Sequence, residues 1–232
     1  MPPRRRSADR WRCGGTYRAP RGERRAARAL IAAPALLAPL AAAAFTVTIA
    51  SGNPTTIYLQ VGNGTFTGGN FDAGGQPANN TTINNETVTL AAGVVGNGTK
   101  QAMTTNSTAS NSFYDGFGFC SAGTQLYIGG FYRRNGGSSA AAVVTATVPA
   151  ALIDGSGDTI PFSQISWTTG GNGDAGAEPF PAGTFVAGGV QTVGTIARNQ
   201  WAESCWTFSY LNTVLPPAGT YTGRVTYTLT TP

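Results

Sequence analysis

Side chains that carry out acid–base chemistry are scarce in this sequence. The 232 residues contain no histidine, so the usual general base and the Ser-His-Asp triad are both excluded. The carboxylates nearest to aromatic residues or glycines are Asp115, Glu178 and Glu203. A glycosidase needs two carboxyl groups at a fixed separation, and nothing in the sequence sets one. We therefore expect no enzymatic activity and no catalytic residues.

One segment, Asp154–Asp158, alternates oxygen-bearing side chains with glycine, as many calcium-binding loops do. Calcium takes six to eight oxygen ligands, and an EF-hand loop ends on an acidic residue at its twelfth position. That position is Ile165 here. Because Asp-Gly pairs are typical of turns, we predict a plain turn and expect no metal and no cofactor. Calcium at this turn is the one alternative left open.

Aromatic side chains could bind a ligand by stacking on sugar rings. The candidates are Trp167, Trp201 and Trp206, together with Tyr127, Phe131 and Tyr132. In a β-sandwich such residues more often fill the core. Two interpretations stay open: a hydrophobic core, or a surface that binds glycans or another surface ligand.

The sequence has three cysteines. Cys13 lies in a predicted N-terminal leader, which leaves Cys120 and Cys205 as an even pair. Such pairs are typical of exported proteins, whose compartments are oxidising. We predict a Cys120–Cys205 disulfide with Cα atoms roughly 4.4 to 6.8 Å apart. Closing so long a loop contributes about 4 kcal/mol in the chain-entropy model.

The leader is predicted over residues 1–44. Residues 1–28 form a long basic region with ten of the fifteen basic residues, and an apolar run interrupted by Pro34 and Pro39 continues to Ala44. A basic region, a short apolar region and a small-residue end indicate a secretory signal peptide. The run is also shorter than the roughly 20 residues of a transmembrane helix. We predict cleavage after Ala44, no membrane span afterwards, and a secreted, periplasmic or cell-surface protein.

The charge balance changes once the leader is set aside. Ten of the fifteen basic residues and two of the ten acidic residues leave with it, so five basic and eight acidic residues remain, a formal charge of −3. The basic character of the whole chain therefore belongs to the leader. Nucleic-acid binding would need a basic face on the folded domain, so we do not expect it.

Residues 45–232 show period-two patterns of β-branched and aromatic residues between turns rich in Gly, Asn and Asp, which indicate strands. The predicted strands cover 45–49, 57–61, a segment starting at 88, 125–132, 141–148, 160–167, 190–197, 204–210 and 220–230. We expect 125–132 and 141–148 to pair across the Asn135-Gly136 turn. Many short strands at this spacing predict one all-β domain, an immunoglobulin-like or jelly-roll β-sandwich.

The segments between these strands are polar. Residues 62–86 form a long stretch of Gly, Asn and Thr in which Phe66 and Phe71 could be anchors. Helix is expected only as a turn near residues 149–152.

The C-terminal segment has the clearest pattern. Its apolar row consists of Tyr221, Val225, Tyr227 and Leu229, and threonines occupy most positions between them. This alternation predicts a half-buried strand. Gly219 and Tyr221 also have the spacing of a tyrosine corner, which precedes the sixth strand of immunoglobulin-like sandwiches.

This tail resembles that of chaperone–usher fimbrial subunits and the related spore-coat-U-like secreted proteins, with Gly219 at the fourteenth position from the end. In that family, a neighbour's N-terminal strand fills the gap left by a missing strand, a form of β-augmentation. The resemblance implies that Phe45, Val47 and Ile49 could be the donated row. The alternative is that they form the domain's own first strand.

These observations predict an exported, non-enzymatic structural or cell-surface protein, a fimbria-like subunit whose partners are copies of itself or other surface subunits. The alternative is a secreted module that binds glycans or another surface ligand.

Overall fold

The computed structural model describes residues 46–174 and 177–232. The predicted leader and Phe45 lie outside the described residues, so the signal peptide and its cleavage site remain predictions. The described residues form the all-β sandwich that the sequence predicts.

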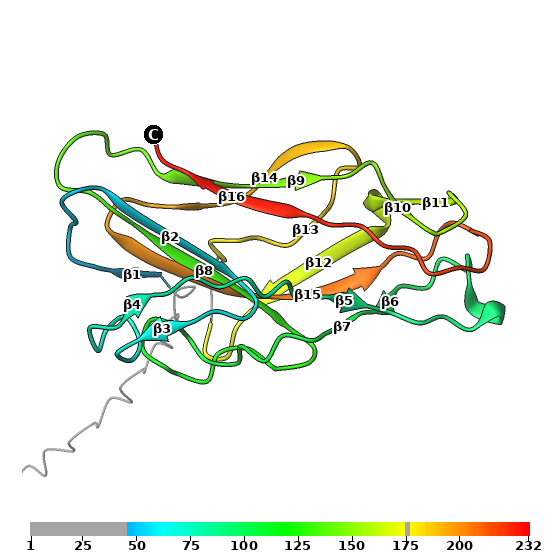
Figure 1. The fold of residues 1–232 in the computed structure, drawn as a ribbon, viewed down its shortest axis with the longest axis horizontal. Helices are drawn as coiled ribbons and strands as arrows, with labels where there is room; N and C mark the ends of the chain where they lie inside the picture. The colour runs from blue at the N-terminus through cyan, green and yellow to red at the C-terminus, as the bar shows by residue number, and fades with distance from the viewer. Residues whose placement is uncertain (1–45, 175–176) are drawn as a thin grey trace, which may run out of the picture. The chain divides into compact units, whose positions relative to one another are not determined.

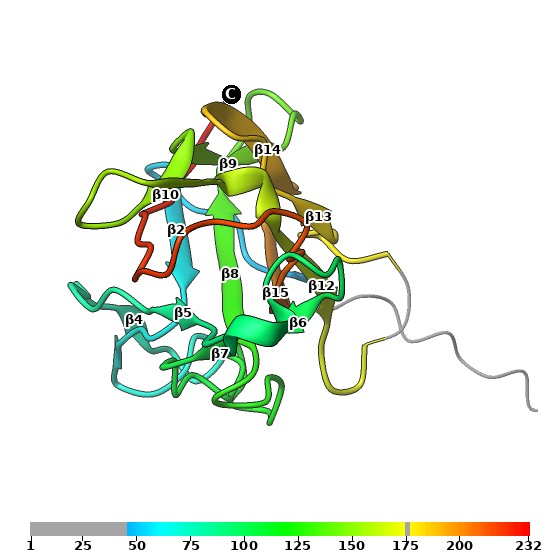
Figure 2. The same ribbon diagram turned by 90° about the vertical axis from the view of Figure 1, so that its right-hand side faces the viewer.

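Two antiparallel sheets stack face to face (Figures 1 and 2). The larger sheet has the order β13-β12-β15-β8-β2, with β1 and β6 also paired to β15, and the smaller sheet has the order β14-β9-β16. The strands of the larger sheet are β1 (Thr46–Thr48), β2 (Thr56–Val61), β6 (Gln101–Ala102), β8 (Leu126–Arg133), β12 (Ile165–Gly170), β13 (Gly183–Thr184) and β15 (Gln200–Tyr210). The strands of the smaller sheet are β9 (Ala142–Val148), β14 (Gly189–Ile196) and β16 (Thr226–Thr230).

Three short two-stranded sheets and two 3₁₀ turns complete the described part of the chain. The small sheets pair β3 (Phe66–Thr67) with β4 (Gln76–Pro77), β5 (Glu86–Thr87) with β7 (Thr104–Thr105), and β10 (Ala151–Ile153) with β11 (Thr159–Pro161). The 3₁₀ turns are η1 (Ala92–Val94) and η2 (Phe162–Gln164). The helical turn expected near residues 149–152 does not form. Residues 149–150 connect β9 to β10, which begins at Ala151.

The main core lies between the sheets and follows from the alternation of side chains along each strand. Trp206 and Phe208 of β15 pack into the same cluster as Val144, Ala146 and Val148 of β9. Burying each large apolar side chain contributes roughly 1.5 to 3 kcal/mol. The core therefore requires the period-two pattern that the sequence shows.

A second core covers the outer face of the larger sheet, because β15 is buried on both faces. The segment 62–125 runs across this face (Figure 1), and it supplies Phe66 and Phe71. Their rings lie 6.2 and 5.1 Å from that of Trp201. The prediction that these two phenylalanines anchor the polar stretch is confirmed.

The predicted disulfide is confirmed and belongs to this second core. Cys120 and Cys205 have Cα atoms 5.6 Å apart, and both are buried with Phe119 and Tyr127. The bond ties the covering segment to the centre of β15.

One strand pairing was predicted wrongly. β8 and β9 both form close to their predicted bounds, but they lie in different sheets and do not pair. Gly136 and Gly137 have positive φ angles of 71° and 76°. The segment 134–141 that contains them is long enough to cross the roughly 10 Å between stacked sheets. The strand predicted to begin at residue 88 does not form, because β5 covers only Glu86–Thr87, although Val88 and Leu90 still pack on the core.

Candidate functional site

The C-terminal strand β16 is the edge of the smaller sheet. Tyr227 and Leu229 are half-buried and pack against the main core, whereas Thr226, Thr228 and Thr230 are exposed. The predicted half-buried strand is confirmed over Thr226–Thr230, whereas residues 220–225, which were also predicted to be strand, lie outside β16. Among the described residues, β16 forms a ladder only with β9, so its opposite edge has no strand partner.

The approach to β16 has the hydrogen bond of a tyrosine corner. The Tyr221 hydroxyl donates to the carbonyl oxygen of Pro217 over 2.9 Å. Two further backbone hydrogen bonds join Thr222 to Ile153. A Cβ at Gly219 would lie 2.7 Å from an Asp154 carboxylate oxygen. A side chain at Gly219 would therefore require the Asp154 carboxylate to move.

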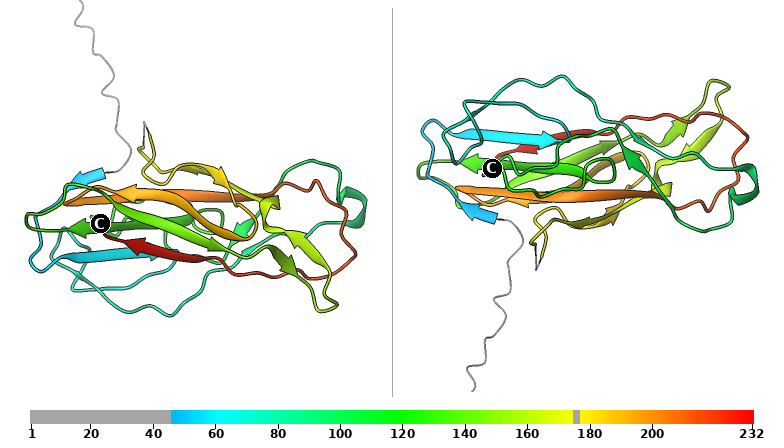
Figure 3. Two further views of the ribbon diagram at one scale, coloured as in Figure 1. Left: turned by 90° about the horizontal axis from the view of Figure 1, so that it is seen from above. Right: turned by 90° about the horizontal axis from the view of Figure 1, so that it is seen from below.

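The free edge of β16 faces the same side of the sandwich as β2, the edge strand of the larger sheet (Figure 3). No ladder joins the two strands. The inward residues Leu59 and Val61 of β2 contact the main core but are only half-buried, like the apolar row of β16. β2 and β16 therefore approach each other along this side without pairing, and the apolar residues of both strands stay half-exposed there.

A carboxyl group also lies beside the apolar row of β16. Glu86 is half-buried, and desolvation raises its pKa to about 7 although a hydrogen bond from Thr105 lowers it. Burial raises the pKa of Tyr227, and the charge of Glu86 raises it further. Glu86 is thus an acidic group beside the apolar row of β16.

The N-terminal strand β1 is part of the same sandwich as the strands that follow it in this chain. β1 pairs antiparallel with residues 200–202 of β15, and Val47 is opposite Trp201. Ile49 is 8% exposed and packs with Trp201 and Phe131. Of the two interpretations of this segment, the structure shows the first strand of the domain itself, and β1 is not next to β16.

The three tryptophans proposed as a stacking surface are not on the surface. Trp167, Trp201 and Trp206 are 4%, 0% and 0% exposed. Each indole N–H donates within the protein, to Pro181 O at 2.9 Å, to Glu203 Oε2 at 2.9 Å and to Phe180 O at 3.0 Å respectively. They are core residues, and the structure corrects their assignment as ligand-stacking aromatics.

Glu203 is a fully buried carboxyl group in the second core. Its Oε2 accepts hydrogen bonds from the Tyr127 hydroxyl at 2.6 Å and from the Trp201 indole at 2.9 Å. Its Oε1 is buried without a hydrogen bond from the described residues. Desolvation raises the pKa of Glu203 to about 7, against hydrogen bonding from Ser112, Tyr127 and Trp201, which lowers it.

The other two candidate acids do not pair with Glu203. Glu178 accepts a hydrogen bond from the Ser204 hydroxyl at 2.7 Å, and Ser204 and Glu203 point to opposite faces of β15 because adjacent residues of a strand alternate. Asp115 caps its own loop by accepting the N–H of Phe117 at 2.8 Å. The described residues hold no group of three or more acidic or cysteine side chains that could bind a metal, and Asp154 Oδ1 accepts two N–H groups of its own turn.

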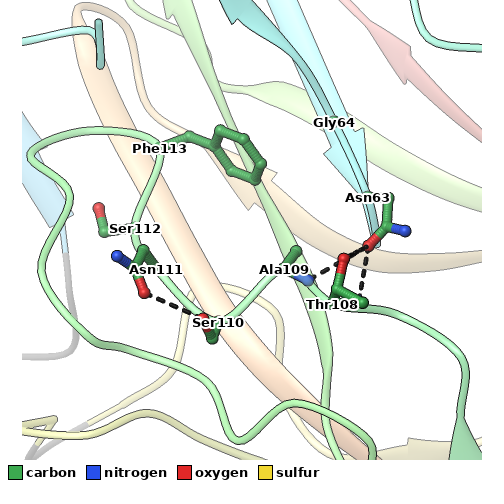
Figure 4. Close-up of a pocket in the computed structure, with 8 residues that line it drawn as sticks. All are labelled: Asn63, Gly64, Thr108, Ala109, Ser110, Asn111, Ser112 and Phe113. Carbon is green, nitrogen blue, oxygen red and sulfur yellow. Dashed lines mark hydrogen bonds between the residues drawn. The ribbon is translucent and has the colours of Figure 1, made fainter.

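A polar pocket lies beside the second core (Figure 4). Its volume is about 450 Å³, and it is lined by Asn63, Gly64 and the segment 108–113. Asn63 Oδ1 accepts hydrogen bonds from the N–H and hydroxyl groups of Thr108 and from the N–H of Ala109. Phe113 is its one aromatic side chain. Sequence patterns do not reveal this pocket, because its residues come from polar segments without periodicity.

No family model, curated protein or solved structure matches this chain. The described residues contain no helix that is long and apolar enough to cross a membrane. What the protein does must be inferred from its own geometry.

Proposed function

We propose that this is an exported, non-enzymatic structural protein of the cell surface, and that copies assemble by adding a strand at the free edge of β16. The observation that carries this proposal is that no strand of residues 46–174 and 177–232 pairs with the outer edge of β16, whose apolar row of Tyr227 and Leu229 is half-exposed. Unpaired N–H and C=O groups along a strand edge readily pair with another chain.

The composition of β16 supports this role. Its five residues, Thr226–Thr230, include no charged residue and no proline, and these are the features that usually protect an edge strand. The other edge strand of the same sheet, β14, has an irregularity between Thr192 and Gly194. Bulges of this kind twist an edge away from partners. The smaller sheet is therefore protected at one edge and open at the other.

The half-exposed apolar residues of β16 and β2 also give an added strand something to bury. A strand paired with β16 would place alternate side chains beside Leu229 of β16 and Leu59 of β2. This is the geometry implied by the resemblance to fimbrial subunits, in which a donated strand completes the sandwich. Because β1 is held on its own sheet beside Trp201, a donated β1 would first have to leave that position.

Size-exclusion chromatography with light scattering on the protein without its leader tests the proposal. Thr226→Lys/Thr228→Lys places two charges on β16, and we expect it to weaken self-association at least tenfold. The matched control is Thr192→Lys/Thr195→Lys on β14, where both threonines are also exposed. A native protein that stays monomeric at millimolar concentration would contradict the proposal, and so would equal effects of the two variants.

The pocket in Figure 4 favours a second candidate function, the binding of a small polar ligand such as a sugar. Its hydroxyl and amide groups with one aromatic ring, Phe113, have the chemistry that sugar hydroxyls and ring faces require. Titration with a panel of mono- and disaccharides, followed by the chemical shifts of residues 108–113, tests it. Absence of any shift at these residues would remove this candidate.

A further inference from the structure

Basic residues gather at one end of the sandwich. Arg133 and Arg134 lie at the end of β8, and Arg198 lies in the turn between β14 and β15. The segments are tied together, because the N–H of Arg134 donates to Asn199 Oδ1 at 2.9 Å. These arginines are three of the five basic residues that follow the leader.

The side chains of Arg133 and Arg198 donate hydrogen bonds only to backbone groups of the described residues, which do not neutralise their positive charge. Arg133 donates to the carbonyl oxygens of Ala50 and Ser51 at 2.9 and 3.3 Å. Arg198 donates to the three carbonyl oxygens of residues 136–138 at 3.2 to 3.4 Å. A backbone carbonyl is neutral, so the guanidinium groups hold the loops together and still give this end a positive field.

The opposite end has the complementary character. Figure 1 shows the loop between β8 and β9 at one end of the sandwich and the β10–β11 hairpin at the other. That hairpin has Asp154 and Asp158 in its turn, and Asp158 is exposed. Leu215 is 79% exposed and lies beside Gly96. The second end therefore offers the acidic groups of the β10–β11 turn, and Leu215 beside Gly96 leaves an apolar side chain in solvent.

We propose that copies of this domain also dock head to tail, with the arginine end of one copy on the Asp154–Asp158 end of the next. This inference rests on the self-assembly put forward above, and it adds the direction of growth. Such a contact is heterologous, so it generates an open filament rather than a closed dimer. Strand addition at β16 occupies the side of the sandwich, which leaves both ends available.

Charge reversal at one position of each end tests this contact. Arg134→Glu and Asp158→Arg each change a side chain that makes no hydrogen bond among the described residues, whereas Arg133 and Asp154 hold loops and are left unchanged. Each variant alone should lose at least tenfold in the association constant at 50 mM salt, measured by sedimentation velocity. Mixing the two variants should restore association, because the mixture contains the native Arg134–Asp158 contact and a reversed Glu–Arg contact.

The matched control is Lys100→Glu, which changes the net charge as much as Arg134→Glu does. Lys100 directly precedes β6, which Figure 1 shows toward the end of the sandwich that holds the β10–β11 hairpin, so this variant should associate as well as the native protein or better. Loss of association in Lys100→Glu equal to that in Arg134→Glu would show an effect of net charge only and overturn the proposal. If both single variants assemble like the native protein while Thr226→Lys/Thr228→Lys does not, head-to-tail docking is wrong and strand addition stands. If the native protein does not associate at any salt concentration, strand addition at β16 and head-to-tail docking are both wrong.

Discussion

The hydroxyl of Tyr127 lies 2.6 Å from the Glu203 carboxylate, in a core sealed from solvent. The two residues belong to neighbouring strands, β8 and β15, and they face the segment 62–125 rather than the main core. Because burial removes the Glu203 carboxylate from water, the charged form of this residue is poorly stabilised although it accepts hydrogen bonds. The second core should therefore be the part of the domain that responds to pH.

Stability should fall as the pH rises from acidic to neutral. The pKa of Glu203 is raised from an ordinary value of 4.5 to about 7 in the folded state, so the folded protein binds more protons than the unfolded chain between these values. Its contribution is complete below pH 4.5 and lost as the pH passes 7, at most about 3 kcal/mol. Glu86 acts in the same direction, more weakly because it is partly exposed. Urea unfolding at pH 5 and pH 8 measures the difference.

Glu203→Gln isolates the contribution of this residue. Glutamine can still accept the hydrogen bonds of Tyr127 and Trp201 but cannot ionise, so the variant should lose most of the pH dependence. Tyr127→Phe removes a hydrogen bond that favours the charged form and should make the dependence steeper. A Glu203→Gln protein with the native pH profile would show that this carboxyl group does not control it.

The disulfide should be a major stabilising element. Replacing Cys120 and Cys205 with serine releases the covering segment from β15 and should lower the free energy of unfolding by roughly 2 to 5 kcal/mol. Urea unfolding of the variant and of the native protein, with and without reductant, measures this. The native protein under reductant should match the variant; if it unfolds at the same urea concentration oxidised and reduced, the bond contributes little.

Gly129 should be irreplaceable at its position in β8. A Cβ there would lie 2.3 Å from the Tyr127 hydroxyl and 2.8 Å from Cβ of Glu203. Overpacking of this kind is destabilising by about 1 to 3 kcal/mol. Gly155→Ala is the matched control, because a Cβ at that position would meet no atom within 4 Å. Thermal unfolding of the two variants should differ clearly, and equal melting temperatures would contradict the packing described for the second core.

Deleting residues 46–50 should destabilise the domain, because Val47 and Ile49 cover Trp201 in the same chain. The expected result is a red shift in tryptophan fluorescence and earlier unfolding in urea. Ile57→Ala, at a side chain that is 45% exposed, is a control that should unfold almost like the native protein. A truncated protein that keeps native fluorescence and binds the deleted segment as a peptide would instead make this strand a donated one.

The elements that depend on a local pattern of residues are the ones that can be predicted from the sequence. Alternation along residues 226–230 is enough to identify β16, and an even cysteine pair is enough to predict the disulfide. The wrong pairing of β8 with β9 has a different origin, because a turn of Asn and Gly does not reveal whether the chain continues in one sheet or crosses to the other.

The burial of the candidate site residues cannot be predicted from local patterns in the sequence. Burial of Trp201 and Glu203 depends on a covering segment 62–125 whose polar composition suggests a solvent-exposed loop. The alternation in β15 is hidden because both faces are buried, so aromatic and acidic residues at 201 and 203 look like surface candidates. Only the three-dimensional arrangement places them under Phe66 and Phe71.

Hydrogen exchange measured as a function of protein concentration tests the central claim most directly. Strand addition pairs the free backbone groups of β16, so peptides covering residues 224–232 should gain protection as the concentration rises. Peptides covering β14 should not change, because that edge has its own irregularity between Thr192 and Gly194. Exchange in residues 224–232 that is the same at all concentrations, or protection that appears only in β14, would contradict assembly through the C-terminal strand.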